Sequence, residues 1–286
     1  MTNAEQQTIE FQKHVNSFFG HRVVGAVAVV QDGNNAPKFE MASGCLTVID
    51  DRLVWMTVSH FLQDVAKWKT DGTLKDLSLV YIIDNTIASS AAIDLSENPF
   101  FHMEEAESLD VGFMVLSSDF YDGIIKGNVK TIPKKNFGAC DIERLGLIQL
   151  IGLSSEGSVL KNSVIHPYEK DGKQFGVNHT QLTDLQKRHV QLKKPETDPD
   201  NPLRRIAHPW RNDEKTVAGM SGGLIVGFIP GGELRGFRVL GIQSGEWNRE
   251  NSNGKFMQRV WFFDATIAYN LIEEKILALS SPPPNA

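Results

Sequence analysis

Short apolar runs rich in Val and Ile alternate with turn-forming residues along most of the chain. One series of such runs lies within residues 22–116, and a second series begins near residue 145. Several short strands at regular spacing are typical of an antiparallel sandwich or barrel, whereas a parallel sheet needs strands that alternate with helices. The pattern therefore predicts an all-β protein with two comparable halves, divided somewhere within residues 125–142.

Helical periodicity is confined to three segments of the sequence. Residues 3–19 and 265–279 place apolar side chains near helical spacing, and a shorter segment at 60–68 interrupts the first β series. The first of these predicts an N-terminal helical arm that packs on the body. The polar stretch 191–216, which contains several prolines, is predicted to be a long loop between strands of the second half.

Composition and charge narrow the class of protein. The chain has 286 residues, of which 41% are hydrophobic and 22% charged, so it can bury a sizeable core in one or two domains. Its 29 basic and 35 acidic residues give a formal charge of −6, which argues against nucleic acid or a membrane surface as a partner. The apolar runs are too short to cross a bilayer.

Cysteine usage and the N-terminal sequence bear on the compartment. The two cysteines, Cys45 and Cys140, are too few for a disulfide framework or a thiolate-rich zinc site. The N-terminus lacks the basic start and apolar core of a secretory signal. We therefore expect a cytoplasmic protein with free thiols.

The candidate chemistry centres on Ser221, which is flanked by glycines and followed by an apolar run. Glycines let the backbone turn tightly and aim successive N–H groups at one point, as an oxyanion hole requires. Alone, such a segment is most often an ordinary turn. It also fits the nucleophile elbow of α/β-hydrolases, in which the catalytic histidine follows the serine. All eight histidines precede Ser221, so this class is excluded.

Two upstream segments supply a histidine and an acid. His60 follows the apolar run 53–58, and Asp110 directly precedes the apolar run 111–116. Each residue alone is typical of a surface or a turn. Together with Ser221 they form an ordered set, His60, Asp110 and Ser221, in which every member lies at the margin of a predicted strand.

This ordered set resembles the trypsin-like (chymotrypsin-fold) serine peptidases, and the resemblance extends over roughly residues 20–279. It is carried by the motifs Thr57-Val58-Ser59-His60, Asp110-Val111-Gly112, Gly219-Met220-Ser221-Gly222-Gly223, Ser43-Gly44-Cys45 and Gln243-Ser244-Gly245.

The resemblance implies a particular architecture. It predicts two six-stranded antiparallel β-barrels, to which the helical periodicity adds an N-terminal helical arm and a C-terminal helix. The arm covers residues 1–20, the first barrel covers 21–130 and carries His60 and Asp110, and the second covers 131–286 and carries Ser221.

The resemblance also implies an activity, that of a serine endopeptidase working through an acyl-enzyme on a protein or peptide substrate. Ser221 would be the nucleophile, His60 the general base and acid, and Asp110 the residue that orients the imidazole. The backbone N–H groups of Gly219 and Ser221 would form the oxyanion hole. No metal or organic cofactor is required.

One departure from the family pattern bears on regulation. Met220 stands where secreted members carry an aspartate that pairs with a new N-terminus, so activation by N-terminal insertion is not expected. An activating protein partner could instead order the loops. Two alternatives to a constitutive enzyme stay open: a catalytically silent scaffold that binds a partner through the same cleft, and a latent protease.

The substrate-binding residues implied by the resemblance are Lys215, Ser244, Gly245 and Glu246. Lys215 would lie at the base of the specificity pocket and favour an acidic side chain, although Glu246 could neutralise it and Lys215 could equally be a solvated loop residue. Ser244 is expected beside Asp110, and Gly245 is expected to leave room for the substrate backbone.

Overall fold

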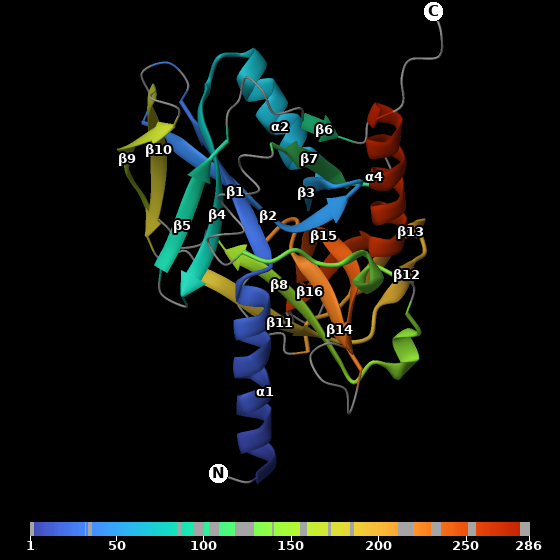
Figure 1. The fold of residues 1–286 in the computed structure, drawn as a ribbon. Coiled ribbons are helices and arrows are strands. Elements are labelled where there is room, and N and C mark those ends of the chain that lie inside the picture. The colour runs from blue at the N-terminus through green and yellow to red at the C-terminus, as the bar shows by residue number, and fades with distance from the viewer. Residues whose placement is uncertain are drawn as a thin grey trace, which may run out of the picture.

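The computed structural model describes most of the chain, and the secondary structure divides into two parts of similar size (Figure 1). The described residues are 3–31, 33, 36–84, 87–93, 100–102, 109–117, 129–138, 140–154, 159–170, 173–183, 186–210, 220–229, 236–250 and 256–280. Within these ranges, no helix combines the length and the apolar character needed to cross a bilayer.

The first part contains one seven-stranded antiparallel sheet with the order β5-β4-β1-β2-β3-β7-β6. Its elements are α1 (Asn3–Gly20), β1 (Val23–Val30), β2 (Lys38–Ile49), β3 (Arg52–Thr57), α2 (Ser59–Thr70), β4 (Leu74–Asp84), β5 (Ile87–Ala92), β6 (Phe100–His102) and β7 (Gly112–Leu116).

Along the chain, the second part contributes another seven-stranded antiparallel sheet, in the order β11-β8-β14-β15-β16-β13-β12, and a separate hairpin of β9 and β10, which lies beside β5 of the first sheet (Figure 1). Its elements are η1 (Lys134–Asn136), η2 (Ile142–Arg144), β8 (Leu147–Ser154), β9 (Val159–Lys170), β10 (Lys173–Thr183), β11 (Gln186–Leu192), β12 (Glu196–Asp198), β13 (Asn201–Ala207), β14 (Leu224–Phe228), β15 (Phe237–Glu250), β16 (Phe256–Asp264) and α4 (Ala265–Ser280).

These elements confirm the predicted fold class, an all-β protein of two antiparallel halves with an N-terminal helical arm and a C-terminal helix. The two sheets have seven strands each, one more than the six predicted. The loop predicted over 191–216 is wrong in part, because it contains the hairpin β12–β13, whose second strand pairs with β16.

Side-chain contacts explain why such a polar segment forms strands. The carboxylate of Asp198, only 3% exposed, accepts a hydrogen bond from Arg204. The guanidinium of Arg204 also lies 4.5 Å from the ring centroid of Trp261 on the neighbouring strand. These contacts hold charged residues against the sheet, so their polarity does not mark a loop.

The arm α1 is anchored by an aromatic cluster at the ends of β14 and β15. The ring of Phe19, which is fully buried, packs edge-on against Phe237 with centroids 5.0 Å apart, and Phe18 packs against the same ring at 5.2 Å. Phe11, further out, packs against Phe228 at 5.6 Å. Figure 1 shows the N-terminal end of α1 extending below the two sheets.

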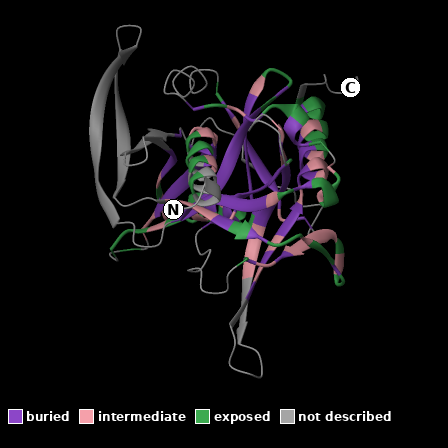
Figure 2. Cartoon of the chain, turned by 90° about the horizontal axis from the view of Figure 1, so that it is seen from below, coloured by how far each residue is buried: buried purple, intermediate pink, exposed green. Residues whose placement is uncertain are grey.

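The two halves share one continuous core, drawn in purple at the centre of Figure 2. At Gly25 of β1 an added Cβ would lie 2.9 Å from the side chain of Leu153 on β8, so the sheets are in close contact there. Packing of this kind fixes the relative position of the halves, because protein interiors are close-packed and tolerate little sliding.

Candidate active site

His60 and Asp110 meet at one end of the first sheet. Strands β3 and β7 are antiparallel with Thr57 opposite Gly112, so the residues that follow β3 and those that precede β7 lie at the same edge. The Nδ1 atom of His60 is 2.6 Å from Oδ2 of Asp110. The backbone N–H of His60 donates to Oδ1 of the same carboxylate at 2.8 Å.

The Asp110 carboxylate also completes the start of helix α2. The N-cap position is Val58, whose side chain cannot accept a hydrogen bond, so an N–H of the first turn needs another acceptor. Asp110 supplies that acceptor from a different strand, and its negative charge is favourable at a helix N-terminus. A single carboxylate thus caps the helix and holds the imidazole that the helix carries.

A glycine allows this close approach of helix and strand. An added Cβ at Gly112, the first residue of β7, would lie 2.8 Å from Leu62 Cδ1 and 3.1 Å from the Cα of Ser59. Any larger residue there would push the first turn of α2 away from β7. Gly112 therefore contributes to the His60–Asp110 contact by letting the helix that carries His60 approach β7.

The second half contributes a third partner to this pair. Ser244 lies on β15 at a break in the register with β16, where pairing shifts between Gln243 and Gly245. Bulges of this kind redirect a side chain. The hydroxyl of Ser244 donates to Oδ2 of Asp110 at 3.0 Å, so the structure places Ser244 beside the acid as the sequence analysis expected.

The electrostatics of the pair favour a charged acid and a strengthened base. Burial would lower the pKa of His60, but the hydrogen bond and charge of Asp110, with a further contribution from Asp64, outweigh it and raise the pKa. Burial would raise the pKa of Asp110, but the hydrogen bonds and charge of His60, together with the Ser244 hydroxyl, lower it. The His60 side chain is 47% exposed, so its ring can be reached by a substrate.

Ser221 occupies the tip of a tight turn before β14. The N–H of Gly223 donates to the carbonyl of Met220 at 2.7 Å, and Gly222 has a φ of +83°, which is the signature of a type II turn. The half-buried Ser221 is thus held in the second position of the turn. Met220, the first residue of the turn, is fully buried in the core of the second sheet, and this burial anchors the turn.

The turn is bonded to both halves of the protein. The carbonyl of Ser221 accepts a hydrogen bond from the N–H of Ser43 on β2 at 2.6 Å. The N–H of Gly222 donates to the carbonyl of Gln243 at 2.8 Å. Gln243 directly precedes Ser244, which bonds to Asp110. Two consecutive residues of β15 therefore hold the Ser221 turn and the His60–Asp110 pair.

The remaining predicted site residues are placed only in part. Gly219 and Lys215 lie outside the described residues. Gly245 pairs with Trp261, and an added Cβ there would find only an ordinary contact at 3.8 Å. Glu246 accepts a hydrogen bond from Nε2 of Gln258 at 3.0 Å, and this contact was not foreseen.

Two hydroxyl residues that connect these parts, Ser43 and Thr57, lie in motifs that carry the resemblance, but the sequence predicted no role for them. The hydroxyl of Thr57 donates to the carbonyl of Ser43 at 2.6 Å, and Ser43 in turn bonds to Ser221. Both residues are fully buried in strands that are otherwise apolar. A buried hydroxyl needs a hydrogen-bond partner, so its presence in an apolar run is the signal that could have identified them.

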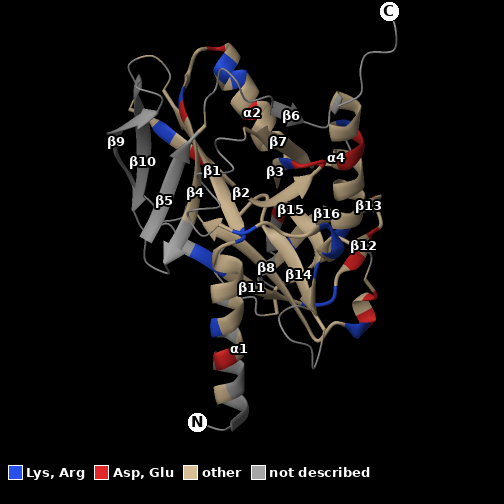
Figure 3. Cartoon of the chain, viewed as in Figure 1, with Lys and Arg blue, Asp and Glu red and all other residues tan. Residues whose placement is uncertain are grey.

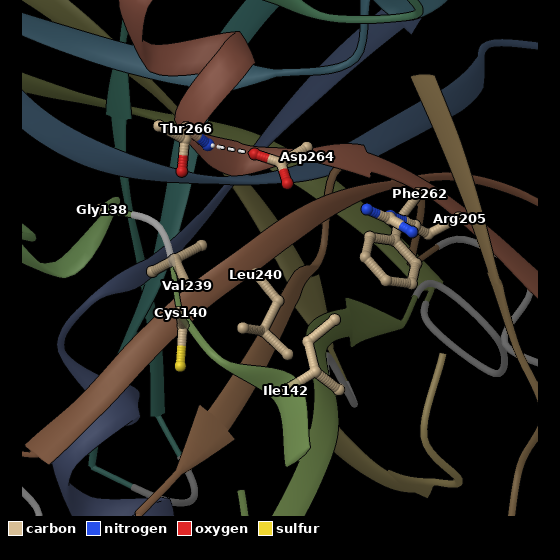
Figure 4. A pocket seen from close by; sticks show the side chains of 9 residues that line it. All are labelled: Gly138, Cys140, Ile142, Arg205, Val239, Leu240, Phe262, Asp264 and Thr266. Atoms are coloured by element: carbon tan, nitrogen blue, oxygen red, sulfur yellow. Dashed lines mark hydrogen bonds between the residues drawn. The ribbon is translucent and has the colours of Figure 1, made fainter. Parts of the chain in front are cut away.

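A pocket elsewhere in the second half does not include any of these residues (Figure 4). It is lined by Gly138, Cys140, Ile142, Arg205, Val239, Leu240, Phe262, Asp264 and Thr266. Asp264 accepts a hydrogen bond from the N–H of Thr266 at 2.8 Å and thereby caps α4.

Among the described residues, no group of three or more His, Cys, Asp or Glu side chains could hold a metal ion. Acidic and basic residues are interspersed over the described elements (Figure 3).

Comparisons with known proteins give a distant structural likeness and no sequence match. No protein-family model matches the sequence, and no curated protein matches it. Among solved structures, the chain is similar to the active form of the Rv3671c protease from M. tuberculosis, with 14% sequence identity and a TM-score of 0.43. The match covers 95% of this chain and 86% of that chain. At this level the likeness neither identifies a family nor assigns an activity.

Proposed function

We propose that this protein is a trypsin-like serine endopeptidase in which His60, Asp110 and Ser221 form the catalytic triad. The observation that carries the proposal is the Asp110 carboxylate, which receives three hydrogen bonds, from the ring and the backbone of His60 and from Ser244. Such an arrangement fixes the orientation and tautomer of an imidazole, which is the task of the triad acid.

The chemistry follows from these roles. Ser221 Oγ attacks the carbonyl carbon of the scissile peptide bond while His60 Nε2 takes its proton. The imidazolium, stabilised by Asp110, then gives that proton to the leaving amine, and an ester between Ser221 and the acyl part remains. Water activated by His60 hydrolyses the ester and restores the serine. The N–H groups of Gly219 and Ser221 are assigned to the oxyanion.

A substrate peptide fits along β15 in this proposal. Strand β14 pairs with β15 only as far as Ile242, whereas β15 continues to Glu250 with β16 on its other edge. In the described part of the chain, no strand covers the edge of β15 beyond Gln243. An extended peptide can add to such an edge through main-chain hydrogen bonds. Gly245 leaves space for it, and Lys215 and Glu246 are assigned to the walls of the specificity pocket.

The compartment proposed is the cytoplasm. Both cysteines are free thiols, and burial raises the pKa of the Cys45 thiol to about 12, which keeps it unreactive. Two cysteines that are free of disulfides suit a reducing environment, in which thiols stay reduced. The proposal also includes regulation by an activating protein partner. Met220 is buried in the core and carries no charge, so it cannot form the ion pair with a new N-terminus that activates secreted members of the family, and activation must come from elsewhere.

A fluorophosphonate probe tests the proposed function directly, because it forms a covalent adduct only with an activated serine. We expect labelling of Ser221 in the wild-type protein and none in Ser221→Ala of equal thermal stability. A peptide-library digest read by mass spectrometry then reports turnover and cleavage preference. Absence of both adduct and turnover in folded protein, with and without cell extract, would leave the silent scaffold as the better description.

A further inference from the structure

Ser43, near the middle of β2, bonds to three different elements through three different polar groups. Its N–H donates to the carbonyl of Ser221 at 2.6 Å, and its carbonyl accepts from the hydroxyl of Thr57 at 2.6 Å. Its own hydroxyl donates to the carbonyl of Leu153 at 3.2 Å and accepts from the N–H of Leu153 at 2.8 Å. Ser43 is fully buried, so each of these bonds is shielded from water.

The two bonds to Leu153 fill a gap in the second sheet. Strand β8 pairs with β14 up to Ile151, which lies opposite Leu224. Before Leu224 the chain turns away through Gly222 to form the tip that carries Ser221. Leu153 lies two residues further along β8, where β14 no longer pairs with it. Its backbone N–H and carbonyl bond to the Ser43 hydroxyl instead of to a neighbouring strand. A buried backbone group without a partner would be destabilising, so the hydroxyl is needed there.

The contact between Ser43 and the turn is also tight. An added Cβ at Gly222 would lie 1.8 Å from the carbonyl oxygen of Ser43. An added Cβ at Gly152 would lie 3.2 Å from the Ser43 hydroxyl and 3.1 Å from the Met220 side chain, so both groups sit against this glycine of β8. Ser43 and the turn therefore cannot shift independently of each other.

We propose that Ser43 is a positioning residue for the nucleophile. It ties the Ser221 turn, which belongs to the second sheet, to Thr57, which lies three residues before His60 on the chain of the first sheet. The inference rests on the proposed peptidase function for its kinetic consequence. A nucleophile and its base must stay within hydrogen-bond reach, and a misplacement of about 1 Å lowers rates by about 100-fold.

The test compares Ser43→Ala with Ser78→Ala. Both residues are fully buried hydroxyls of the first sheet, but the Ser78 hydroxyl bonds to Asp76 instead of to the turn. Ser43→Ala keeps the backbone groups that bond to Ser221 and Thr57, but it removes the hydroxyl that holds this backbone against Leu153. We therefore expect it to lower the maximal rate of fluorophosphonate labelling at least about tenfold, with the half-saturating probe concentration changed less than about twofold. Ser78→Ala is expected to label at the wild-type rate. Because Ser43→Ala also leaves buried backbone groups of Leu153 without this partner, both variants are labelled below their unfolding transitions, so that a loss of stability is not counted as a loss of rate.

A second measurement does not depend on activity. Amide hydrogen exchange followed by NMR should show faster exchange at Leu153 and Gly222 in Ser43→Ala, and no change at these amides in Ser78→Ala. If Ser43→Ala does not fold, Thr57→Val removes the other bond to Ser43 while keeping the side-chain shape, and it should lower the labelling rate in the same direction.

The outcomes separate the two proposals. Wild-type protein that is never labelled overturns the peptidase, and the exchange rates then decide whether Ser43 holds the turn. Wild-type protein that is labelled, together with a folded Ser43→Ala or Thr57→Val variant labelled at the same rate, overturns the positioning role. Unchanged protection of the Gly222 amide in Ser43→Ala overturns it as well.

Discussion

The Oδ2 atom of Asp110 lies 2.6 Å from Nδ1 of His60, while Oδ1 accepts the backbone N–H of the same histidine at 2.8 Å. The two oxygens of one carboxylate therefore hold both the ring and the main chain of a single residue. This bidentate contact restrains the imidazole more than a side-chain hydrogen bond alone, because the helix that carries the ring is capped by the same group.

Replacing this carboxylate should impair the enzyme far more than the fold. Asp110→Asn keeps an oxygen that can cap α2, but its amide N–H₂ facing Nδ1 would stabilise the wrong imidazole tautomer. By analogy with triad acids in general, we expect the rate of Ser221 labelling to fall about 10⁴-fold. The free energy of unfolding should fall by only about 1 kcal/mol, as for the loss of a charge at a helix N-terminus.

Asp64→Asn is the matched control for that substitution. Asp64 lies on α2, as His60 does, and its charge raises the pKa of His60. In the described structure, no hydrogen bond joins the side chains of Asp64 and His60. We expect a change in labelling rate of less than about threefold. Equal loss of labelling in the two variants would show that negative charge near the ring, and not the bidentate contact, is what matters.

The pH dependence of labelling should reflect the raised pKa of His60. Only neutral imidazole can accept the proton from Ser221, so the rate should rise with pH through a midpoint above 6.5, the ordinary value for histidine. In Asp110→Asn the residual activity should have its midpoint at lower pH, because the stabilising charge is gone. A wild-type midpoint below 6.5 would contradict the assignment of His60 as the base paired with Asp110.

The same pair gives stability a defined pH window. The raised pKa of His60 adds stability that is complete below pH 6.5 and is lost as pH rises through the folded-state value. The lowered pKa of Asp110 adds stability that is present above pH 3.8 and is lost as pH falls through its folded-state value. Denaturation midpoints should therefore show a contribution from the pair that is largest between these limits and absent in Asp110→Asn.

The candidate site residues could be found along the chain because each lies at the margin of an apolar run: His60 after one, and Asp110 and Ser221 before one. His60 and Asp110 flank strands that pair with each other, so their proximity follows once β3 and β7 are neighbours. The role of Ser244 was accessible only through resemblance to a family, since nothing in the run around it marks a bulge.

Other features could not be predicted, for physical reasons that the residues make plain. The hydroxyl of Ser43 bonds to Leu153, which lies 110 positions away in the chain, and no local pattern encodes that contact. The hairpin β12–β13 was missed because the buried contact of Asp198 with Arg204, and the packing of Arg204 on Trp261, are tertiary contacts. A run of charged residues predicts a loop unless their partners on neighbouring elements are known.

The helical arm should prove integral to the stability of the second half. Phe19 is fully buried and packs edge-on against Phe237 and Phe228, at centroid distances of 5.0 and 6.1 Å. Phe19→Ala should lower the free energy of unfolding by about 3–5 kcal/mol, measured by chemical denaturation. Phe11→Ala should have a smaller effect, since Phe11 is only partly buried against Phe228. Equal effects would mean that the arm is held uniformly along its length.

Gly222 should be the least replaceable glycine of the site. It combines a φ of +83° with a Cβ position only 1.8 Å from the Ser43 carbonyl oxygen and 2.7 Å from the Thr57 hydroxyl. Gly72 has a similar φ of +69° but open space around its Cβ position. Gly72→Ala should therefore report backbone strain alone, about 1–2 kcal/mol. Gly222→Ala adds a steric clash with rigid backbone, which we expect to raise the loss by about a further 1–3 kcal/mol.

The same comparison separates stability from positioning of the nucleophile. Gly222→Ala can relieve its clash only by moving the turn away from Ser43, which carries Ser221 with it. Labelling by the fluorophosphonate probe, measured below the unfolding transition of each variant, should fall about 100-fold in Gly222→Ala and stay at the wild-type rate in Gly72→Ala. A Gly222→Ala protein that is as stable as Gly72→Ala and is labelled normally would mean that the turn does not lie against β2 as described.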